Sequence, residues 1–284
     1  MHPRLIHTLV LLDPAILRPV TALLNNTLFD QSDMIGPRLQ LLTYRRDTWP
    51  SRDAAACSFR QNPFYKTWDP RALDRFVTYG LRDIPTHTSV TNTSGKPHEP
   101  VPVTLTTPLA KELASFARPY YNLPVPGAGP DHLRNRLTHP DLDPQLKTVM
   151  PFYRPEIAQM FYQLPYLRPS VLYIFASESP ICQAEMRADR LQNTGTGVGG
   201  SGGVAAGRVR EAVLQGCSHQ VPFEAVDACA DEIARWFGRE IRRWGEEEQA
   251  FNDSWARKSL AEKTTVDEEW KRHVPKPRRV KSNL

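Results

Sequence analysis

The sequence predicts an α/β fold in which a short parallel sheet carries a mainly helical insertion. Three apolar, β-prone runs predict about three strands, at residues 5–12, 170–176 and 209–214. Nearly continuous apolar character is typical of strands buried on both faces of a parallel sheet. Helix-like patterns lie between and after these runs, and such alternation is characteristic of the α/β class.

Bulk composition allows a globular enzyme and argues against several other classes. The chain has 284 residues, is 40% hydrophobic and carries a formal net charge of +5. Because its basic residues form no aromatic-interleaved stripe, we expect no nucleic-acid partner. The 4 cysteines lack metal-type spacing and disulfide density, so we expect free thiols in a reducing compartment and neither metal nor cofactor. The apolar run at 5–12 is too short to span a membrane and precedes no cleavage pattern.

The first strand is followed by a long interval, about 14–169, that we interpret as an inserted lid. Aromatic residues crowd its first half, which is typical of a small core and also of a cover over an apolar acyl chain. A short strand is predicted at 101–107. Helices are predicted at 17–28, 53–59, 71–79, 109–117 and 155–164.

One histidine, His219, lies in a setting that suits a general base. The third strand leads to a turn at Gly216, His219 follows, and Pro222 opens an apolar helix at 223–237. A loop between a strand and a helix holds an imidazole at the rim of a sheet, where it is able to accept a proton. The residues alone are equally compatible with a histidine that only caps or packs in this loop.

The stretch around His219 resembles the histidine loop of the α/β-hydrolase fold, which often reads G-x-G-H-x-x-P/x-x-E. Gly216, His219, Pro222 and Glu224 match this pattern, whereas the Cys-Ser pair before the histidine departs mildly from it. The segments LIHTLVLLDPAI and RPSVLYIFASES are similar to the sixth strand and to the strand that normally delivers the catalytic acid.

Two further segments, YRRDTWPSRDAA and TGTGVGGSGGVAAGRV, extend the resemblance over most of residues 1–239. The chain is similar to the fungal hydrolase family of host-selective toxin biosynthesis and, more distantly, to the yeast peroxisomal lipase. This resemblance implies hydrolysis of an ester or CoA thioester of an apolar acyl compound in fungal secondary metabolism, with His219 as the base.

Two carboxylates are candidates for the acid that orients His219. Glu178 stands just after the second strand, where many α/β hydrolases carry their acid, although Ser179 occupies the usual place. Asp13 follows the first strand, as the acid does in some relatives, and we rank it ahead of Glu178. The Asp13-Pro14 pair is also a common turn at a strand end.

No nucleophile elbow accompanies these residues, although acyl-enzyme chemistry requires a nucleophile. The early strands and oxyanion-hole loop of the resembled fold are missing, so either this is a half-length version of the family or the reading frame starts upstream. Ser201 formally satisfies G-x-S-x-G, but the polar residues 192–197 before it predict no strand. We interpret 194–207 as a mobile glycine-rich loop rather than an elbow or a phosphate cradle.

An alternative to the hydrolase is a catalytically inactive remnant that acts as an interaction partner. The missing strands would leave the first strand as an exposed, apolar sheet edge with a tendency to associate with another copy or with a full-length paralogue.

The sequence changes character after residues 1–239, which the resemblance assigns to the C-terminal part of an α/β-hydrolase domain. Residues 240–263 predict a charged helix, and 264–284 predict a disordered basic tail. The chain ends in Ser282-Asn283-Leu284, one residue away from the Ser-Lys-Leu peroxisomal address. We therefore expect recognition by the peroxisomal import receptor and a peroxisomal location, with the cytoplasm as the alternative.

Overall fold

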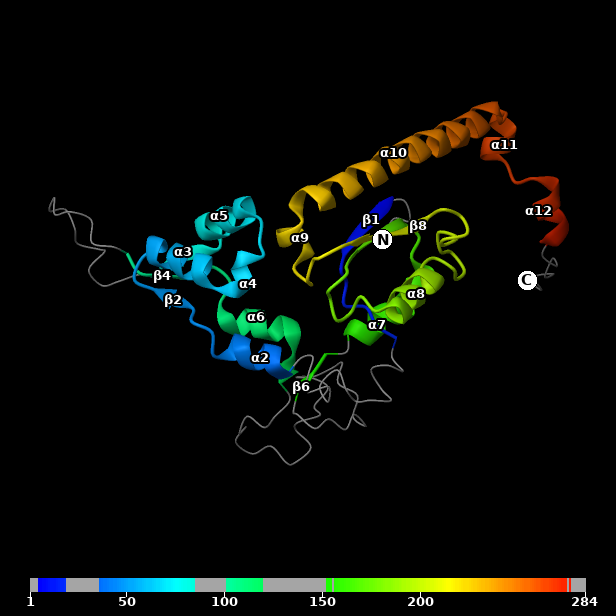
Figure 1. The fold of residues 1–284 in the computed structure, drawn as a ribbon. Coiled ribbons are helices and arrows are strands. Elements are labelled where there is room, and N and C mark those ends of the chain that lie inside the picture. The colour runs from blue at the N-terminus through cyan, green and yellow to red at the C-terminus, as the bar shows by residue number, and fades with distance from the viewer. Residues whose placement is uncertain are drawn as a thin grey trace, which may run out of the picture. The chain divides into compact units, whose positions relative to one another are not determined.

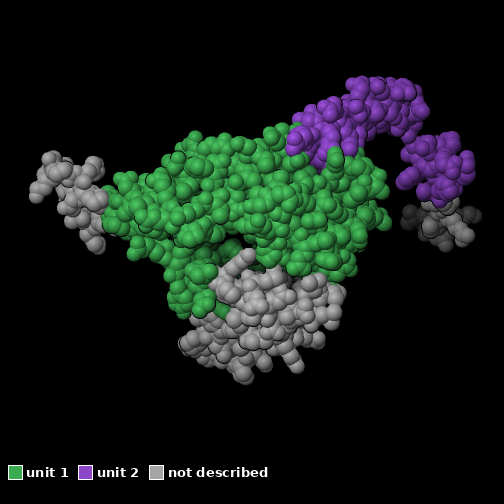
Figure 2. Space-filling view, in the orientation of Figure 1, with its two compact units in different colours: residues 1–234 green, residues 235–284 purple. Residues whose placement is uncertain are grey.

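The computed structural model describes residues 5–18, 36–84, 101–119, 152–154, 156–274 and 276. Figure 1 shows the order of the helices and strands along the chain. The chain divides into two compact units, residues 1–234 and 235–284 (Figure 2). The first unit contains the parallel sheet, the insertion and His219.

The three predicted strands form one parallel sheet in the order β1-β7-β8, with β1 at Thr8–Leu12, β7 at Ser170–Ala176 and β8 at Val209–Leu214. All seven residues of the central strand β7 are buried. Burial on both faces explains its continuous apolar sequence. The predicted parallel α/β sheet is confirmed, but β1 and β8 are only partly buried, because each of them pairs with a single described neighbour.

The core of this sheet is packed around the side chains of β7. The rings of Tyr173 and Phe175 lie parallel, with centroids 5.4 Å apart, and both side chains are fully buried. The Tyr173 hydroxyl shares a 2.7 Å hydrogen bond with the Thr194 hydroxyl, so its polar atom is satisfied. Burying one such aromatic side chain stabilises the fold by about 1.5–3 kcal/mol.

Helix α8, at Ala184–Asn193, connects β7 to β8. The sequence analysis identified no helix here. The side chain of Leu191 packs against the core around β7, so this helix covers part of the sheet.

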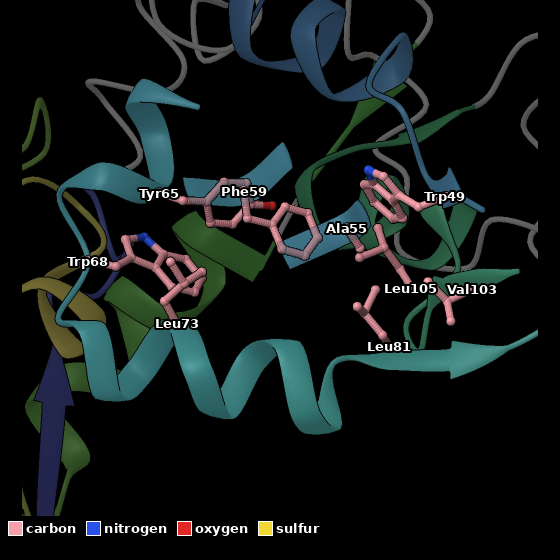
Figure 3. Packing of buried hydrophobic residues seen from close by; sticks show 9 residues of the cluster. All are labelled: Trp49, Ala55, Phe59, Tyr65, Trp68, Leu73, Leu81, Val103 and Leu105. Carbon is pink, nitrogen blue, oxygen red and sulfur yellow. The ribbon is translucent and has the colours of Figure 1, made fainter. Parts of the chain in front are cut away.

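The insertion between β1 and β7 has its own core, which Figure 3 shows in close-up. A three-stranded antiparallel sheet of order β2-β4-β3 lies beside its helices. The elements are α2 (Gly36–Thr43), β2 (Thr48–Trp49), α3 (Arg52–Gln61), α4 (Pro63–Lys66), α5 (Pro70–Tyr79), β3 (Leu81–Asp83), β4 (Val103–Leu105) and α6 (Leu109–Phe116). The buried core residues are Trp49, Ala55, Phe59, Tyr65, Trp68, Leu73, Leu81, Val103 and Leu105.

Local capping sets the starts of these short helices. Ser51 caps α3 by accepting a hydrogen bond from the Ala54 backbone N–H at 3.1 Å. Asn62 and Asp69 cap α4 and α5, and each is followed by a proline at the first helical position. Such a proline loses no hydrogen bond, since the first amides of a helix have no partner within it.

The second half of the insertion returns the chain to the sheet. It contains β5 (Arg118–Pro119), β6 (Phe152–Tyr153), α7 (Glu156–Gln163) and a 3₁₀ turn, η2 (Leu164–Tyr166). The predictions at 101–107, 109–117 and 155–164 correspond to β4, α6 and α7. The helix predicted at 17–28 lies mostly outside the described residues.

The glycine-rich segment 194–207 is folded tightly, which differs from the mobile loop that its composition predicts. The Gly195 N–H donates to the Leu164 carbonyl at 2.8 Å, and the Ser201 N–H donates to the Leu167 carbonyl at 2.9 Å. A Cβ atom at Gly200 would lie 2.5 Å from two carbonyl oxygens. The glycines therefore permit close backbone packing, and these amides are not available to cradle a phosphate.

The C-terminal helices depart from the divisions expected from the sequence. After the short helix α9 (Val221–Glu224), helix α10 runs from Val226 to Arg257 without a break, so the boundary predicted at 239 falls inside a helix. Helices α11 (Leu260–Thr264) and α12 (Glu268–His273) follow.

Helix α12 lies within the segment predicted to be disordered. Asp267 caps it by accepting a hydrogen bond from the Trp270 N–H at 2.6 Å, and Glu269 pairs with Arg272 on its surface. The tripeptide Ser282-Asn283-Leu284 lies outside the described residues. Among the described helices, none has the length and apolar character needed to cross a membrane.

Candidate active site

Asp13 is placed by the turn that ends β1. Its backbone N–H donates to the Ile174 carbonyl of β7 at 2.7 Å, which continues the ladder of the parallel sheet by one residue. Its φ angle is +41°, a left-handed conformation that aspartate tolerates better than most residues. The chain therefore leaves the sheet abruptly, and the Asp13 carboxylate is fully buried.

His219 stands in the loop after β8, and its imidazole Nδ1 lies 2.7 Å from the Asp13 Oδ2 atom. The loop turns at Gly216, whose φ is +69° and whose N–H donates to the Ser177 hydroxyl at 2.9 Å. Because the strands are parallel, the segments after β1, β7 and β8 all meet at one edge of the sheet. Residues 206 positions apart in sequence are thus brought into contact there.

The pair has the geometry of an acid that orients a base. An Nδ1–H donated to the carboxylate leaves the Nε2 lone pair free to accept a proton. The His219 side chain is 34% exposed, whereas the Asp13 side chain is fully buried. Within the described segments no side chain forms a hydrogen bond with Nε2.

Glu178 is not brought to His219. Its backbone N–H donates to the Cys217 carbonyl at 3.0 Å, and its side chain is exposed. It contributes to the local electrostatics, because burial, Glu224 and Glu178 together raise the pKa of the Cys217 thiol. Of the two carboxylates that the sequence analysis proposed, only Asp13 contacts the imidazole.

Glu224 fixes the histidine loop from the other side. Its carboxylate accepts hydrogen bonds from the Ser218 backbone N–H at 2.6 Å and from the Ser218 hydroxyl at 2.7 Å. It also accepts one from the Thr67 hydroxyl of the insertion at 2.8 Å. The sequence pattern identified Glu224, but it gave no signal for the contact with the insertion.

Arg190 is a site residue that the sequence analysis did not identify. Its guanidinium is fully buried and donates to the Pro14 carbonyl at 2.8 Å and to the Ile181 carbonyl at 2.5 Å. Burial lowers the pKa of Arg190, and the nearby Asp13 carboxylate partly opposes that shift. Arg190 therefore supports the turn that carries Asp13.

Ser201 lies at the opposite end of the sheet from His219. Its N–H donates to the carbonyl of Leu167, and both residues precede strands that run toward the histidine edge. At ~3.3 Å per residue, the six-residue strand β8 separates the two ends by about 20 Å. This placement argues against Ser201 as the nucleophile that His219 would activate.

Within the segments that the structure describes, no group of three or more His, Cys, Asp or Glu side chains could hold a metal ion. The described free cysteines are Cys57, which is exposed, and three buried residues, Cys182, Cys217 and Cys229.

The known proteins to which this chain is similar in sequence include hydrolases. The chain is 36% identical over 283 residues to the type I acyl-CoA thioesterase mpaH' of Penicillium brevicompactum, covering 95% of this chain and 61% of that protein. It is 35% identical over 261 residues to the type I acyl-CoA thioesterase mpaH of Penicillium roqueforti, covering 87% and 58%. The chain thus spans about three-fifths of the length of these relatives. No protein-family model matches the sequence.

An abhydrolase domain-containing protein of Alternaria alternata is 25% identical over 276 residues, covering 95% of this chain and 89% of that protein. Among solved structures, the peroxisomal alpha-beta-hydrolase Lpx1 from Saccharomyces cerevisiae superposes with a TM-score of 0.51 at 13% identity, covering 94% of this chain and 58% of that one. That likeness concerns the fold alone. Together with the parallel sheet, this likeness shows that the chain has an α/β-hydrolase fold.

Proposed function

We propose that this chain supplies the acid and the base of a hydrolase that cleaves a CoA thioester or an ester of an apolar acyl compound in fungal secondary metabolism. The observation that carries the proposal is the 2.7 Å contact between the buried Asp13 carboxylate and the His219 imidazole. The thioester is favoured because two relatives at 35–36% identity are named acyl-CoA thioesterases.

In this proposal His219 Nε2 takes a proton from the nucleophile as it attacks the acyl carbon. Asp13 stabilises the imidazolium that forms, and the imidazolium then gives its proton to the departing thiolate or alkoxide. Since no hydroxyl or thiol of the described residues contacts Nε2, the nucleophile is either a water molecule or a group from outside the described segments.

The direct test is an assay of the purified chain with short- and medium-chain acyl-CoA thioesters and nitrophenyl esters. We expect His219→Ala to abolish hydrolysis and Asp13→Asn to lower kcat by about 10⁴-fold, because the imidazole loses its orienting acid. Glu178→Gln and Ser201→Ala are the controls and should leave kcat within about twofold. Hydrolysis by the wild-type chain that survives His219→Ala would contradict the proposal.

The edge strand β1 favours a second candidate, a non-catalytic partner. In the described part of the chain β1 pairs with β7 alone, so its other backbone edge has no described strand beside it. A strand edge that no other strand of its own chain covers promotes association with another chain. Size-exclusion chromatography with light scattering tests this candidate, and a stable monomer at micromolar concentration would argue against it.

We also propose that the protein works in peroxisomes. The support is the C-terminal Ser282-Asn283-Leu284, preceded by several basic residues. A fluorescent protein that carries the last dozen residues should appear in peroxisomal puncta, and deletion of Leu284 should return it to the cytosol. Diffuse fluorescence from the intact tail would favour the cytoplasm.

A further inference from the structure

We propose that the helical insertion positions the general base, with Thr67 and Trp68 as positioning residues that act on His219 through α9. This inference rests on the proposed role of His219. Two neighbouring residues of the insertion contact two neighbouring residues of α9, and α9 directly follows the histidine loop. In this proposal the insertion is a part of the catalytic apparatus.

The first contact is a ring stack between Trp68 and Phe223. The ring centroids are 4.3 Å apart, and the planes are inclined by only 11°. Trp68 is buried and belongs to the core of the insertion, where Figure 3 shows it beside Tyr65 and Leu73. Because the same ring packs in that core and on Phe223, α9 is attached to the buried aromatic cluster of the insertion.

The second contact runs through Glu224. Its Oε1 atom accepts hydrogen bonds from the Thr67 hydroxyl and the Ser218 hydroxyl, and its Oε2 atom accepts one from the Ser218 backbone N–H. Ser218 immediately precedes His219. One carboxylate thus connects the insertion to the peptide unit that carries the imidazole.

A backbone hydrogen bond and an arginine that pairs with two carboxylates extend the same interface. The Asp69 N–H donates to the Phe223 carbonyl at 2.8 Å. The Arg71 guanidinium bridges Asp69 at 2.7 Å and Asp227 at 2.8 Å. Hydrogen bonds from Arg71 lower the pKa of Asp69 to about 2, so that this carboxylate is ionised at neutral pH.

The functional consequence follows from the geometry of the base. A general base works only when it lies within hydrogen-bond distance of the proton that it takes, and a displacement of about 1 Å costs up to ~10²-fold in rate. If the insertion is detached from α9, the backbone at Ser218 loses its anchor and the contact between His219 and Asp13 loosens.

The test is NMR of the 284-residue chain labelled with ¹⁵N-histidine. The signal to follow is the downfield Nδ1–H proton of His219, assigned by its absence in His219→Ala. Trp68→Ala is compared with Phe64→Ala, since Phe64 is a neighbouring aromatic in α4 that is half exposed. Thr67→Val removes only the hydroxyl, and Thr67→Ser restores it. Circular dichroism confirms that each variant is folded.

We expect the Nδ1–H signal to lose about half of its intensity or more in Trp68→Ala and Thr67→Val, and to be retained in Phe64→Ala and Thr67→Ser. In the hydrolysis assay the first two variants should lower kcat about tenfold with KM nearly unchanged. If Trp68→Ala unfolds the insertion, the Nδ1–H signal of the Thr67→Val variant alone tests the positioning role. A Thr67→Val signal equal to that of wild type would overturn the inference.

The NMR signal requires no turnover. Failure of the proposed function would appear as activity that survives His219→Ala, whatever the signal shows. Failure of the positioning role would appear as an unchanged signal in the folded Thr67→Val variant.

Discussion

Replacing Arg190 with methionine tests whether a buried cation supports Asp13. The guanidinium donates charge-assisted hydrogen bonds to the Pro14 and Ile181 carbonyls, each worth about 1.5–3 kcal/mol. It also lies 4.7 Å from the centroid of the Phe175 ring, which adds about 2 kcal/mol when such a contact is desolvated.

These gains are partly offset by the desolvation of the cation, which costs several kcal/mol. Its Nε atom is buried without a hydrogen-bond partner among the described atoms, and this adds to the cost. Methionine would restore packing but leave the Asp13 carboxylate without its nearby cation. We therefore expect Arg190→Met to lower the free energy of unfolding by about 2–6 kcal/mol, because the Pro14 and Ile181 carbonyls each lose a buried donor at a cost of about 1–3 kcal/mol.

Urea unfolding followed by circular dichroism measures this difference. The matched control is Arg187→Met on the same helix, because Arg187 forms a partly exposed ion pair with Glu211 at 3.2 Å, worth about 0–1 kcal/mol. Arg190→Lys keeps the charge without the planar fork and should fall between the two. Equal stabilities of Arg190→Met and Arg187→Met, within about 1 kcal/mol, would refute the reasoning.

Three other predictions follow. Iodoacetamide at neutral pH should label Cys57 alone in the native protein, because the other described thiols are buried and burial raises the pKa of Cys217; rapid labelling of Cys217, found by mass spectrometry, would contradict this. Gly200→Ala should destabilise the protein by about 1–3 kcal/mol, since its Cβ would clash with two carbonyl oxygens; an unchanged Tm would argue against the tight fold of 194–207. The pKa of Asp69 is lowered from 3.8 to about 2 by Arg71, so its stabilising contribution is present above pH 4 and is lost as the pH falls through 2; stability curves of wild type and Asp69→Asn that change in parallel over that range would refute this.

The sheet was predictable because its central strand is buried on both faces. Such a strand is expected to be apolar at nearly every position, and in β7 the residues 171–176 after Ser170 are all hydrophobic. The helices of the insertion were predictable for a different reason, since Ser51 and Asp69 supply capping oxygens at their starts. Helix α4 was missed because its four residues are too few to show a helical period.

The supporting residues of the site could not be predicted from local patterns. Arg190 stands in a polar helical stretch, where an arginine is ordinarily solvated; only the packing of α8 against the turn after β1 buries it. Thr67 lies 157 positions before its partner Glu224 in α9. No local periodicity in the sequence can indicate a contact between residues so far apart. The glycine-rich segment has the composition of a mobile loop, but the carbonyls that fix it belong to residues 164–167.

The choice between Asp13 and Glu178 illustrates the limit most directly. Both residues follow parallel strands of one sheet, so both reach the edge where His219 lies. The direction of the backbone separates them. After β7, the Ser177 hydroxyl and the Glu178 N–H are both used to hold the histidine loop, and the Glu178 side chain is left exposed. After β1, the left-handed conformation of Asp13 turns the chain so that its carboxylate is buried against the imidazole. This position requires a residue that tolerates a left-handed backbone conformation and carries a negative charge. Aspartate meets both requirements.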